Sequence, residues 1–154
     1  MSLSAFVKRL VSNVVPTQSR ASGGPYITCA PANAAFKQLQ AHATKGISAW
    51  GNMVELLSAT ANTTDCWVEA VMINQATAAM ELNVAITMET GTGAPTAAQI
   101  EAIVPAYVDT GAAGQVIVPV KPPVYIPAGN RIAAALAGTA TKKVDCAVII
   151  SRRR

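Results

Sequence analysis

Apolar and polar positions alternate most regularly between residues 79 and 90. Leu82, Val84, Ile86 and Met88 occupy every second position there, and polar or small residues stand between them. A period of two is typical of a β-strand that has one face against a core and the other in water. We therefore predict a half-buried strand over residues 79–90.

Seven other β-rich runs, each bounded by turn residues, cover residues 52–59, 66–74, 103–108, 115–120, 124–126, 131–137 and 144–151. Pro122 and Pro123 separate two of these runs, and because proline cannot donate a ladder hydrogen bond we expect them at a sheet edge or at a crossing between sheets. The segment from Pro127 to Asn130 is a predicted turn, since Gly129 and Asn130 tolerate positive φ. About eight short strands predict an all-β fold, a two-sheet antiparallel sandwich that resembles a jelly roll.

The N-terminal part of the chain has a different pattern. Apolar residues at helical spacing predict a short amphipathic helix, and they are Leu3, Phe6, Val7, Leu10 and Val14. Pro16 ends this pattern, and residues 17–31 are expected to form an extended tether. Residues 32–43 fit either a helical turn or an extended arm. The chain is thus divided into a basic arm over residues 1–48, extended or partly helical, and a sandwich domain with a basic C-terminal tail over residues 49–154.

Composition indicates a surface that is poor in charge. Charged residues make up 13% of the chain, 51% of residues are hydrophobic and the mean hydropathy is +0.34, whereas soluble domains average about 25% charged residues. A surface of this kind favours burial against other subunits over a free monomer. No window approaches the roughly 18 to 20 consecutive apolar residues of a membrane-spanning helix, so no membrane contact is expected.

Charge is distributed unevenly along the chain. Residues 1–48 hold five basic residues and no acidic one, whereas all eight acidic residues lie between residues 49 and 151. The last three residues are arginines. This distribution suits a basic arm and tail that pair with an acidic protein surface. Contact with nucleic acid is the competing interpretation, but the cations are sparse and no aromatic residues alternate with them.

The three cysteines, Cys29, Cys66 and Cys146, have no C-x-x-C spacing, and each lies among apolar neighbours. An odd number with this spacing indicates neither a disulfide framework nor a zinc site. We expect buried free thiols in reducing surroundings, with a bridge between Cys66 and Cys146 as a minor alternative.

Residues for catalysis are scarce, and we predict that the protein is not an enzyme and has no metal or other cofactor. His42 is the only histidine, which excludes a site with two histidine ligands. Glu81 and Glu89 fall on the outward side of a predicted strand, where solvation is the expected role. No glycine-rich loop carries the lysine of a phosphate-binding motif.

The C-terminal half nevertheless resembles a known family. Residues 124–133, with the sequence VYIPAGNRIA, precede the final apolar strand at residues 144–150, and a small-residue loop at residues 111–114 comes before both. These features are similar to those of small β-sandwich virion structural proteins of tailed bacteriophages. The resemblance covers roughly residues 50–151 and none of the arm. It implies a structural protein of the virion, assembled in the host cytoplasm, on the capsid or on a tail or fibre.

From the resemblance and the charge pattern we expect a capsid decoration or cement protein whose arm docks on neighbouring subunits. Its partner would be the major capsid protein or another virion subunit, and a homo-oligomer is expected, with a trimer favoured. The residues assigned to this contact are Leu3, Phe6, Val7, Lys8, Arg9, Leu10, Arg20, Arg152, Arg153 and Arg154. The alternatives are a tail, tail-fibre or baseplate protein, a carbohydrate-binding sandwich, and a coat protein in contact with the genome.

Overall fold

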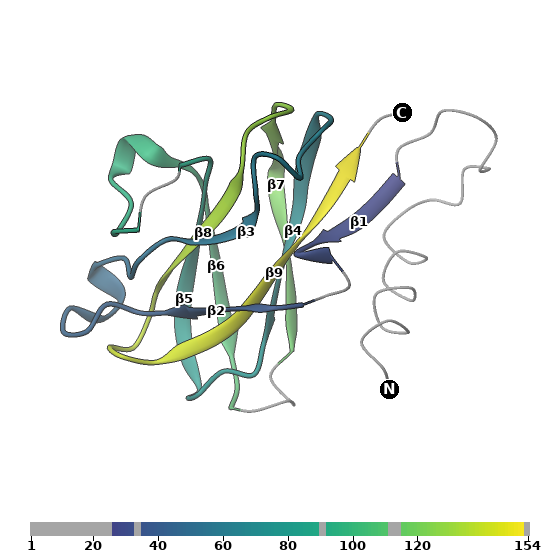
Figure 1. Ribbon diagram of the computed structural model, residues 1–154. Coiled ribbons are helices and arrows are strands. Elements are labelled where there is room, and N and C mark those ends of the chain that lie inside the picture. The colour runs from purple at the N-terminus through teal and green to yellow at the C-terminus, as the bar shows by residue number, and fades with distance from the viewer. Residues whose placement is uncertain (1–25, 33–34, 90–91, 111–114, 153–154) are drawn as a thin grey trace.

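Two antiparallel sheets pack face to face in the computed structural model, which describes residues 26–32, 35–89, 92–110 and 115–152 (Figure 1). The strands are β1 (Tyr26–Ala30), β2 (Lys37–Gln40), β3 (Val54–Leu57), β4 (Cys66–Asn74), β5 (Met80–Thr87), β6 (Ile100–Val108), β7 (Val116–Ile126), β8 (Ile132–Ala137) and β9 (Lys143–Arg152), and two 3-10 helices are η2 (Gly46–Ser48) and η3 (Ala97–Gln99). No helix in these ranges is long and apolar enough to cross a membrane.

The order of the strands identifies the topology. Sheet A has the order β1-β9-β4-β7, with β2 also paired to β9, and sheet B has the order β3-β8-β5-β6. From β2 onward the chain changes sheet at each connection except the one between β5 and β6. The paths β2-β9-β4-β7 and β3-β8-β5-β6 are the two four-stranded sheets of a jelly roll. The predicted all-β, two-sheet, jelly-roll-like fold is confirmed.

The core lies between the sheets and is made of alternating residues from both. Its larger members are Val68, Val71, Ile73, Leu82, Val84, Ile86, Ile126, Ile132, Leu136, Val148 and Ile150. Each is buried, and full burial of such a side chain contributes about 1.5–3 kcal/mol relative to exposure. Most of the inward residues are β-branched, which suits a pleated strand.

The two predicted runs on either side of Pro122 and Pro123 form the single strand β7. Its register with β4 pairs Val124 with Val68 and Pro119 with Ala70, so residues 120–123 bulge opposite one residue of β4. Because β7 is the last strand of sheet A, the missing N–H groups of the prolines interrupt no interior ladder. The expected edge position of these prolines is confirmed.

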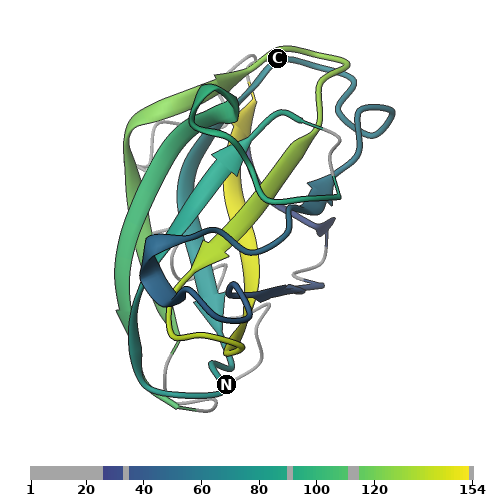
Figure 2. The same cartoon turned by 90° about the vertical axis from the view of Figure 1, so that its left-hand side faces the viewer.

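The outer side of β5 differs from the prediction. Leu82, Val84 and Ile86 face the core as expected, but Ala85 and Thr87 on the other face are buried as well. The segment between β2 and β3 passes over the outer face of sheet B (Figure 2), where Met53 packs on Ala85. The prediction that the outer face of β5 lies in water is therefore wrong for Ala85 and Thr87, in the second half of the strand.

Residues 26–48, which the sequence pattern placed in the arm, contribute two strands to sheet A. Both β1 and β2 pair antiparallel with β9. The segment left open between a helical turn and an extended arm contains β2. The described part of the sandwich therefore begins at Tyr26. The predicted helix and residues 17–25 of the predicted tether lie outside the described residues, whereas residues 26–30 of that tether form β1.

A buried asparagine joins two loops at one end of the sandwich. The Asn62 side chain is fully buried and donates to the carbonyl oxygens of Pro127 at 3.0 Å and Asn130 at 2.9 Å. The backbone carbonyl oxygen of Asn62 accepts from Gly129 N–H at 2.7 Å, in the turn where Gly129 has φ +79. The buried amide thus has both of its N–H donors bonded to carbonyl groups of the turn, and the turn predicted at residues 127–130 is confirmed.

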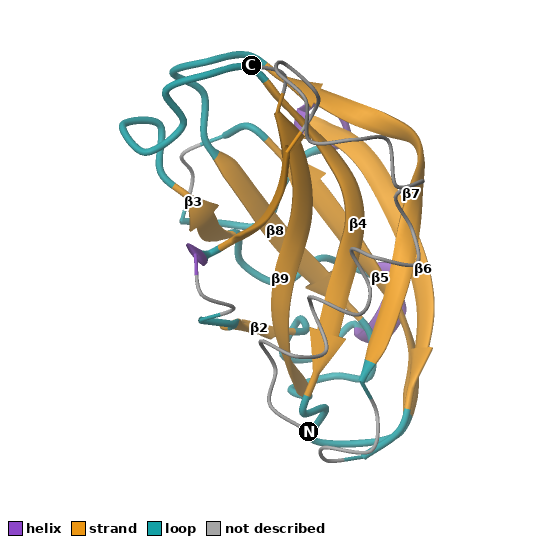
Figure 3. Cartoon of the chain, turned by 90° about the vertical axis from the view of Figure 1, so that its right-hand side faces the viewer, coloured by secondary structure: helices purple, strands orange, loops and turns teal. Residues whose placement is uncertain are grey.

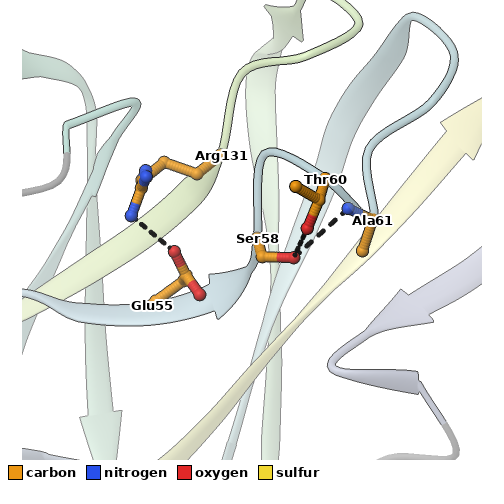
Figure 4. A network of polar contacts seen from close by, with 5 residues as sticks. All are labelled: Glu55, Ser58, Thr60, Ala61 and Arg131. Carbon is orange, nitrogen blue, oxygen red and sulfur yellow. Dashed lines mark hydrogen bonds and ion pairs between the residues drawn. The ribbon is translucent and has the colours of Figure 1, made fainter.

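Strand β3 is held at the edge of sheet B by short polar contacts (Figure 4). Arg131 and Glu55 form an ion pair at 2.7 Å. In the loop after β3, Ser58 Oγ accepts from Ala61 N–H at 3.2 Å. Because both charged side chains are partly exposed, the pair contributes at most about 1 kcal/mol.

Gly51 allows the segment between β2 and β3 to lie against the end of β2. Its N–H donates to Leu136 O at 2.8 Å, and a Cβ at this position would lie 1.8 Å from the Gln40 carbonyl oxygen. A backbone atom cannot rotate away from such a contact. No other residue fits there without a shift of the backbone.

We predict that Gly51→Ala lowers the free energy of unfolding by about 3 kcal/mol, the upper end of the cost of overpacking. Equilibrium urea unfolding measures the change. Gly93→Ala is the matched control, because a Cβ at Gly93 meets no atom within 4 Å, and it should change stability by less than about 0.5 kcal/mol. Equal stability of the two variants would contradict the packing described here.

Candidate interaction surface

Most residues predicted to bind a partner lie outside the described residues. These are Leu3, Phe6, Val7, Lys8, Arg9, Leu10, Arg20, Arg153 and Arg154. Arg152 is described and ends β9, between Tyr26 of β1 and Cys66 of β4. Its guanidinium donates to Asn62 Oδ1 at 3.3 Å and is partly buried. Arg152 is therefore part of the sandwich, and its assignment to a partner contact stays a prediction.

The cysteines are buried free thiols, as predicted. Burial raises the pKa of Cys146 to about 12, so this thiol stays protonated at neutral pH. Cys66 pairs with Arg152 and Cys146 pairs with Ile73, which separates the two sulfurs by about six residues, or roughly 20 Å, along neighbouring strands. A disulfide between them is excluded, because bridged Cα atoms lie within about 7 Å.

The side chains considered for catalysis are His42, Glu81 and Glu89. The Nδ1 atom of His42 accepts from the N–H groups of Thr44 at 3.1 Å and Lys45 at 3.2 Å, which closes a turn ahead of η2. Glu81 and Glu89 are exposed. In the described ranges, no group of three or more His, Cys, Asp or Glu residues is placed to hold a metal ion.

The exposed apolar side chains of β6 and β7 indicate a different surface. These two strands are the edges of their sheets and run side by side along one flank of the sandwich (Figure 3). On β6, Ile103 is 55% exposed and Tyr107 is 61% exposed, and Tyr125 of β7 is 46% exposed. Pro105 lies between the two β6 residues on the same side and is exposed too. We call these four residues the β6–β7 surface.

A shallow groove of about 460 Å³ follows the line where the two edge strands meet. Its lining residues are Glu101, Ala102, Ile103, Lys121, Pro122, Pro123, Val124 and Tyr125. The bulge of β7 places its prolines here. One acidic and one basic side chain line the groove together with aliphatic residues and Tyr125, so it presents both polar and apolar surface.

Asp65 fixes the orientation of Tyr125 at the end of this groove. The Tyr125 hydroxyl donates to Asp65 Oδ2 at 2.8 Å, and the Ala128 N–H donates to Oδ1 at 2.9 Å. The ring also packs on Trp67, with centroids 5.2 Å apart and planes at 47°. The hydrogen bond from Ala128 N–H, and to a smaller extent the one from the Tyr125 hydroxyl, lowers the pKa of Asp65. The bond between Tyr125 and Asp65 also raises the pKa of Tyr125. The tyrosine ring is therefore held in one position by Asp65 and Trp67.

Sequence reasoning missed the β6–β7 surface. The alternation in β6 contains a usable signal, because Glu101, Ile103, Pro105 and Tyr107 share one face. The opposite face, with Val104 and its neighbours, is also apolar. Hydropathy alone could not decide which row points to the core.

We predict that Asp65→Ala lowers stability at pH 7 and that the difference from the unaltered protein disappears in acid. The pKa of Asp65 is lower in the folded protein than the value of about 3.9 that an aspartate has in the unfolded chain. The ionised carboxylate therefore stabilises the fold at pH values above about 3.9, and this stabilisation is lost as the pH falls through the folded-state pKa. Urea unfolding of both proteins at pH 7 and near pH 3 measures it. Glu81→Ala, at an exposed site on β5, is the control. A difference of equal size at both pH values would contradict the role given to the carboxylate.

Comparison with solved structures finds low structural similarity to protein chains of infectious bursal disease virus. A structure of its Gx strain has a TM-score of 0.39 and 16% sequence identity, covering 90% of this chain and 36% of that one. A mutant VP2 protein of the same virus, in derived T=1 particles, has a TM-score of 0.36 and 13% identity, covering 90% and 34%. This chain spans about a third of the length of either match. No family model matches the chain, and no curated protein sequence is similar to it. The fold assignment therefore depends on the strand order given above.

Proposed function

We propose that this protein is a structural subunit of a tailed-bacteriophage virion, a capsid decoration protein that binds neighbouring subunits and performs no catalysis. The proposal combines the sequence resemblance of residues 50–151 with the jelly-roll strand order, an architecture found in viral capsid and lectin domains. Its partner is the major capsid protein or another virion subunit.

The observation that carries the proposal is the β6–β7 surface. Ile103 and Tyr107 are large, apolar and more than half exposed on an edge strand. Large apolar and aromatic side chains held in fixed positions are the usual anchors of protein interfaces. A strand at the edge of a sheet that carries such a row also tends to associate with other chains. A bound partner would remove this apolar surface from water.

The arm and tail complete the proposal. The apolar residues of the arm, including Phe6 and Leu10, would bury against a neighbour, and the cations at positions 8, 9, 20, 153 and 154 would pair with its acidic groups. Many weak contacts of this kind add up over a lattice of subunits. A homo-oligomer, with a trimer favoured, fits the same scheme. A tail, fibre or baseplate location is the alternative within this class.

The combined substitution Ile103→Glu and Tyr107→Glu should weaken binding to the capsid at least about tenfold, which corresponds to 1.4 kcal/mol, because two charges would be buried in an apolar contact. Co-sedimentation of the purified protein with particles that lack it measures the change. Tyr26→Glu is the control, since Tyr26 is 41% exposed on β1 at the opposite edge of sheet A. The surface assignment fails if the double variant binds normally.

A second prediction separates protein docking from genome contact. If the basic segments meet an acidic protein surface, salt should weaken binding while nuclease treatment leaves the protein on the particle. If they meet nucleic acid, the isolated chain should bind any duplex, with an affinity that falls steeply as salt rises. Electrophoretic mobility shifts with random DNA test this. Sub-micromolar binding at physiological salt would contradict the proposal.

Carbohydrate binding is the second candidate, and the groove is the observation that favours it. Tyr125 presents a fixed aromatic ring beside Glu101 and Lys121, a combination that can stack on a sugar ring and bond its hydroxyl groups. Screening the protein against immobilised glycans tests this alternative. Binding that Tyr125→Ala abolishes, together with no binding to particles, would favour it over decoration.

A further inference from the structure

The flank opposite the β6–β7 surface is basic. β6 and β7 end their sheets on one side, and β2 and β3 lie side by side on the other (Figure 3). Lysines gather on β2, in the turn that follows it and at the start of β9, which pairs with β2. With an exposed isoleucine in η2 they make up what we call the β2 flank: Lys37, Lys45, Ile47, Lys142 and Lys143. Asp145 lies opposite Gln38 of β2 in register, so the flank has four positive charges against one negative charge, a net of +3.

Hydrogen bonds hold the parts of the β2 flank together. The Ala41 N–H, just after β2, donates to Lys142 O at 2.9 Å. The Lys45 N–H donates to His42 Nδ1 at 3.2 Å, in the turn that leads into η2. Lys45 is exposed, and Ile47, two residues later, is 50% exposed. The β2 flank therefore presents a large apolar side chain among cations.

The β6–β7 surface lies among acidic side chains. Glu101 belongs to the outward row of β6, and Asp109 directly follows this strand. Glu81 of β5 is opposite Tyr107 in register. All three acidic residues are exposed. Together with Lys121, which lines the groove, they give three negative charges against one positive charge, a net of −2.

We propose that the β6–β7 surface of one copy of this chain binds the β2 flank of a second copy. The opposite net charges of the two surfaces favour this encounter over contact between two like surfaces. Ile47 of one copy then packs against Ile103 and Tyr107 of the other, which removes apolar area of both from water.

The two surfaces lie on opposite sides of one sandwich, so the contact joins unlike surfaces of the two copies. A contact of this type forms a ring where the rotation between copies closes, and the trimer expected from the sequence is such a ring. The inference rests on the proposed role of the β6–β7 surface as an interface, and it names another copy of the chain as the subunit that covers it.

Charge reversal on either surface of the full-length protein tests the contact. Lys37→Glu combined with Lys45→Glu alters the β2 flank, and Glu81→Lys combined with Glu101→Lys alters the β6–β7 side. Each variant alone should self-associate at least about tenfold more weakly, because like charges then face each other. An equimolar mixture of the two variants should associate again, because each altered surface then meets one of opposite charge. Sedimentation velocity over a range of protein concentrations measures both effects.

The matched controls keep the charge at the same positions. Lys37→Arg with Lys45→Arg, and Glu81→Asp with Glu101→Asp, should change the association constant by less than about twofold. Circular dichroism checks that every variant is folded. If a reversed variant unfolds, the neutral pair Glu81→Gln and Glu101→Gln decides: weaker association supports the proposal and unchanged association overturns it.

Three results would overturn the proposal. The unaltered protein could stay monomeric at every concentration, or the mixture of reversed variants could stay dissociated. Weaker association of the Glu81 and Glu101 variant alone would show that two β6–β7 surfaces meet each other. Binding to particles is measured separately by co-sedimentation. A protein that binds particles but stays monomeric in solution therefore refutes this contact and leaves the decoration role standing, and self-association without particle binding does the reverse.

Discussion

The sandwich depends on the pairing of its last strand. β9 lies between β4 on one side and both β1 and β2 on the other, so it joins the beginning of the described chain to the centre of sheet A. Its inner row, with Val148 and Ile150, fills the core, and its outer row, with Ala147 and Ile149, belongs to a second apolar cluster on the outer face of sheet A, which we call the outer cluster. A strand buried on both faces has no solvated side, which explains why residues 144–150 are almost continuously apolar.

This constraint explains why the fold class could be predicted and part of the chain could not. Strands β4, β5 and β9 carry long β-rich runs. The limits of β4 and β9 fell within one residue of the prediction, and β5 begins one residue after and ends three residues before its predicted limits. β2 has four residues with one buried side chain, Leu39. No hydropathy window could separate such a strand from a loop, because its place comes from pairing with β9, more than 100 residues later in the chain.

The candidate surface was harder to predict than the fold for a related reason. In β6 both rows of side chains are largely apolar, and only the three-dimensional arrangement shows that Val104 and Val108 face the core while Ile103 and Tyr107 face outward. The outer cluster on sheet A has the same cause, since Met72 and Val71 are equally apolar neighbours with opposite directions. Relative to β9, β4 has one extra residue, Glu69, between the pairs Val68–Ile150 and Ala70–Ile149, and this bulge reverses the phase of β4, which sequence periodicity does not reveal. An excess of apolar residues was visible in the composition, but its division between core and surface was not.

The central claim is that this jelly roll, with few charges and one apolar flank, binds neighbouring protein subunits through that flank. A direct image of the bound subunit tests this claim. Electron microscopy of the native particle at a resolution that traces strands would locate the subunit. The account predicts a sandwich on the capsid whose β6 and β7 edges are buried against a neighbouring subunit. A particle without the protein, or a bound sandwich with Ile103 and Tyr107 facing open solvent, would contradict it.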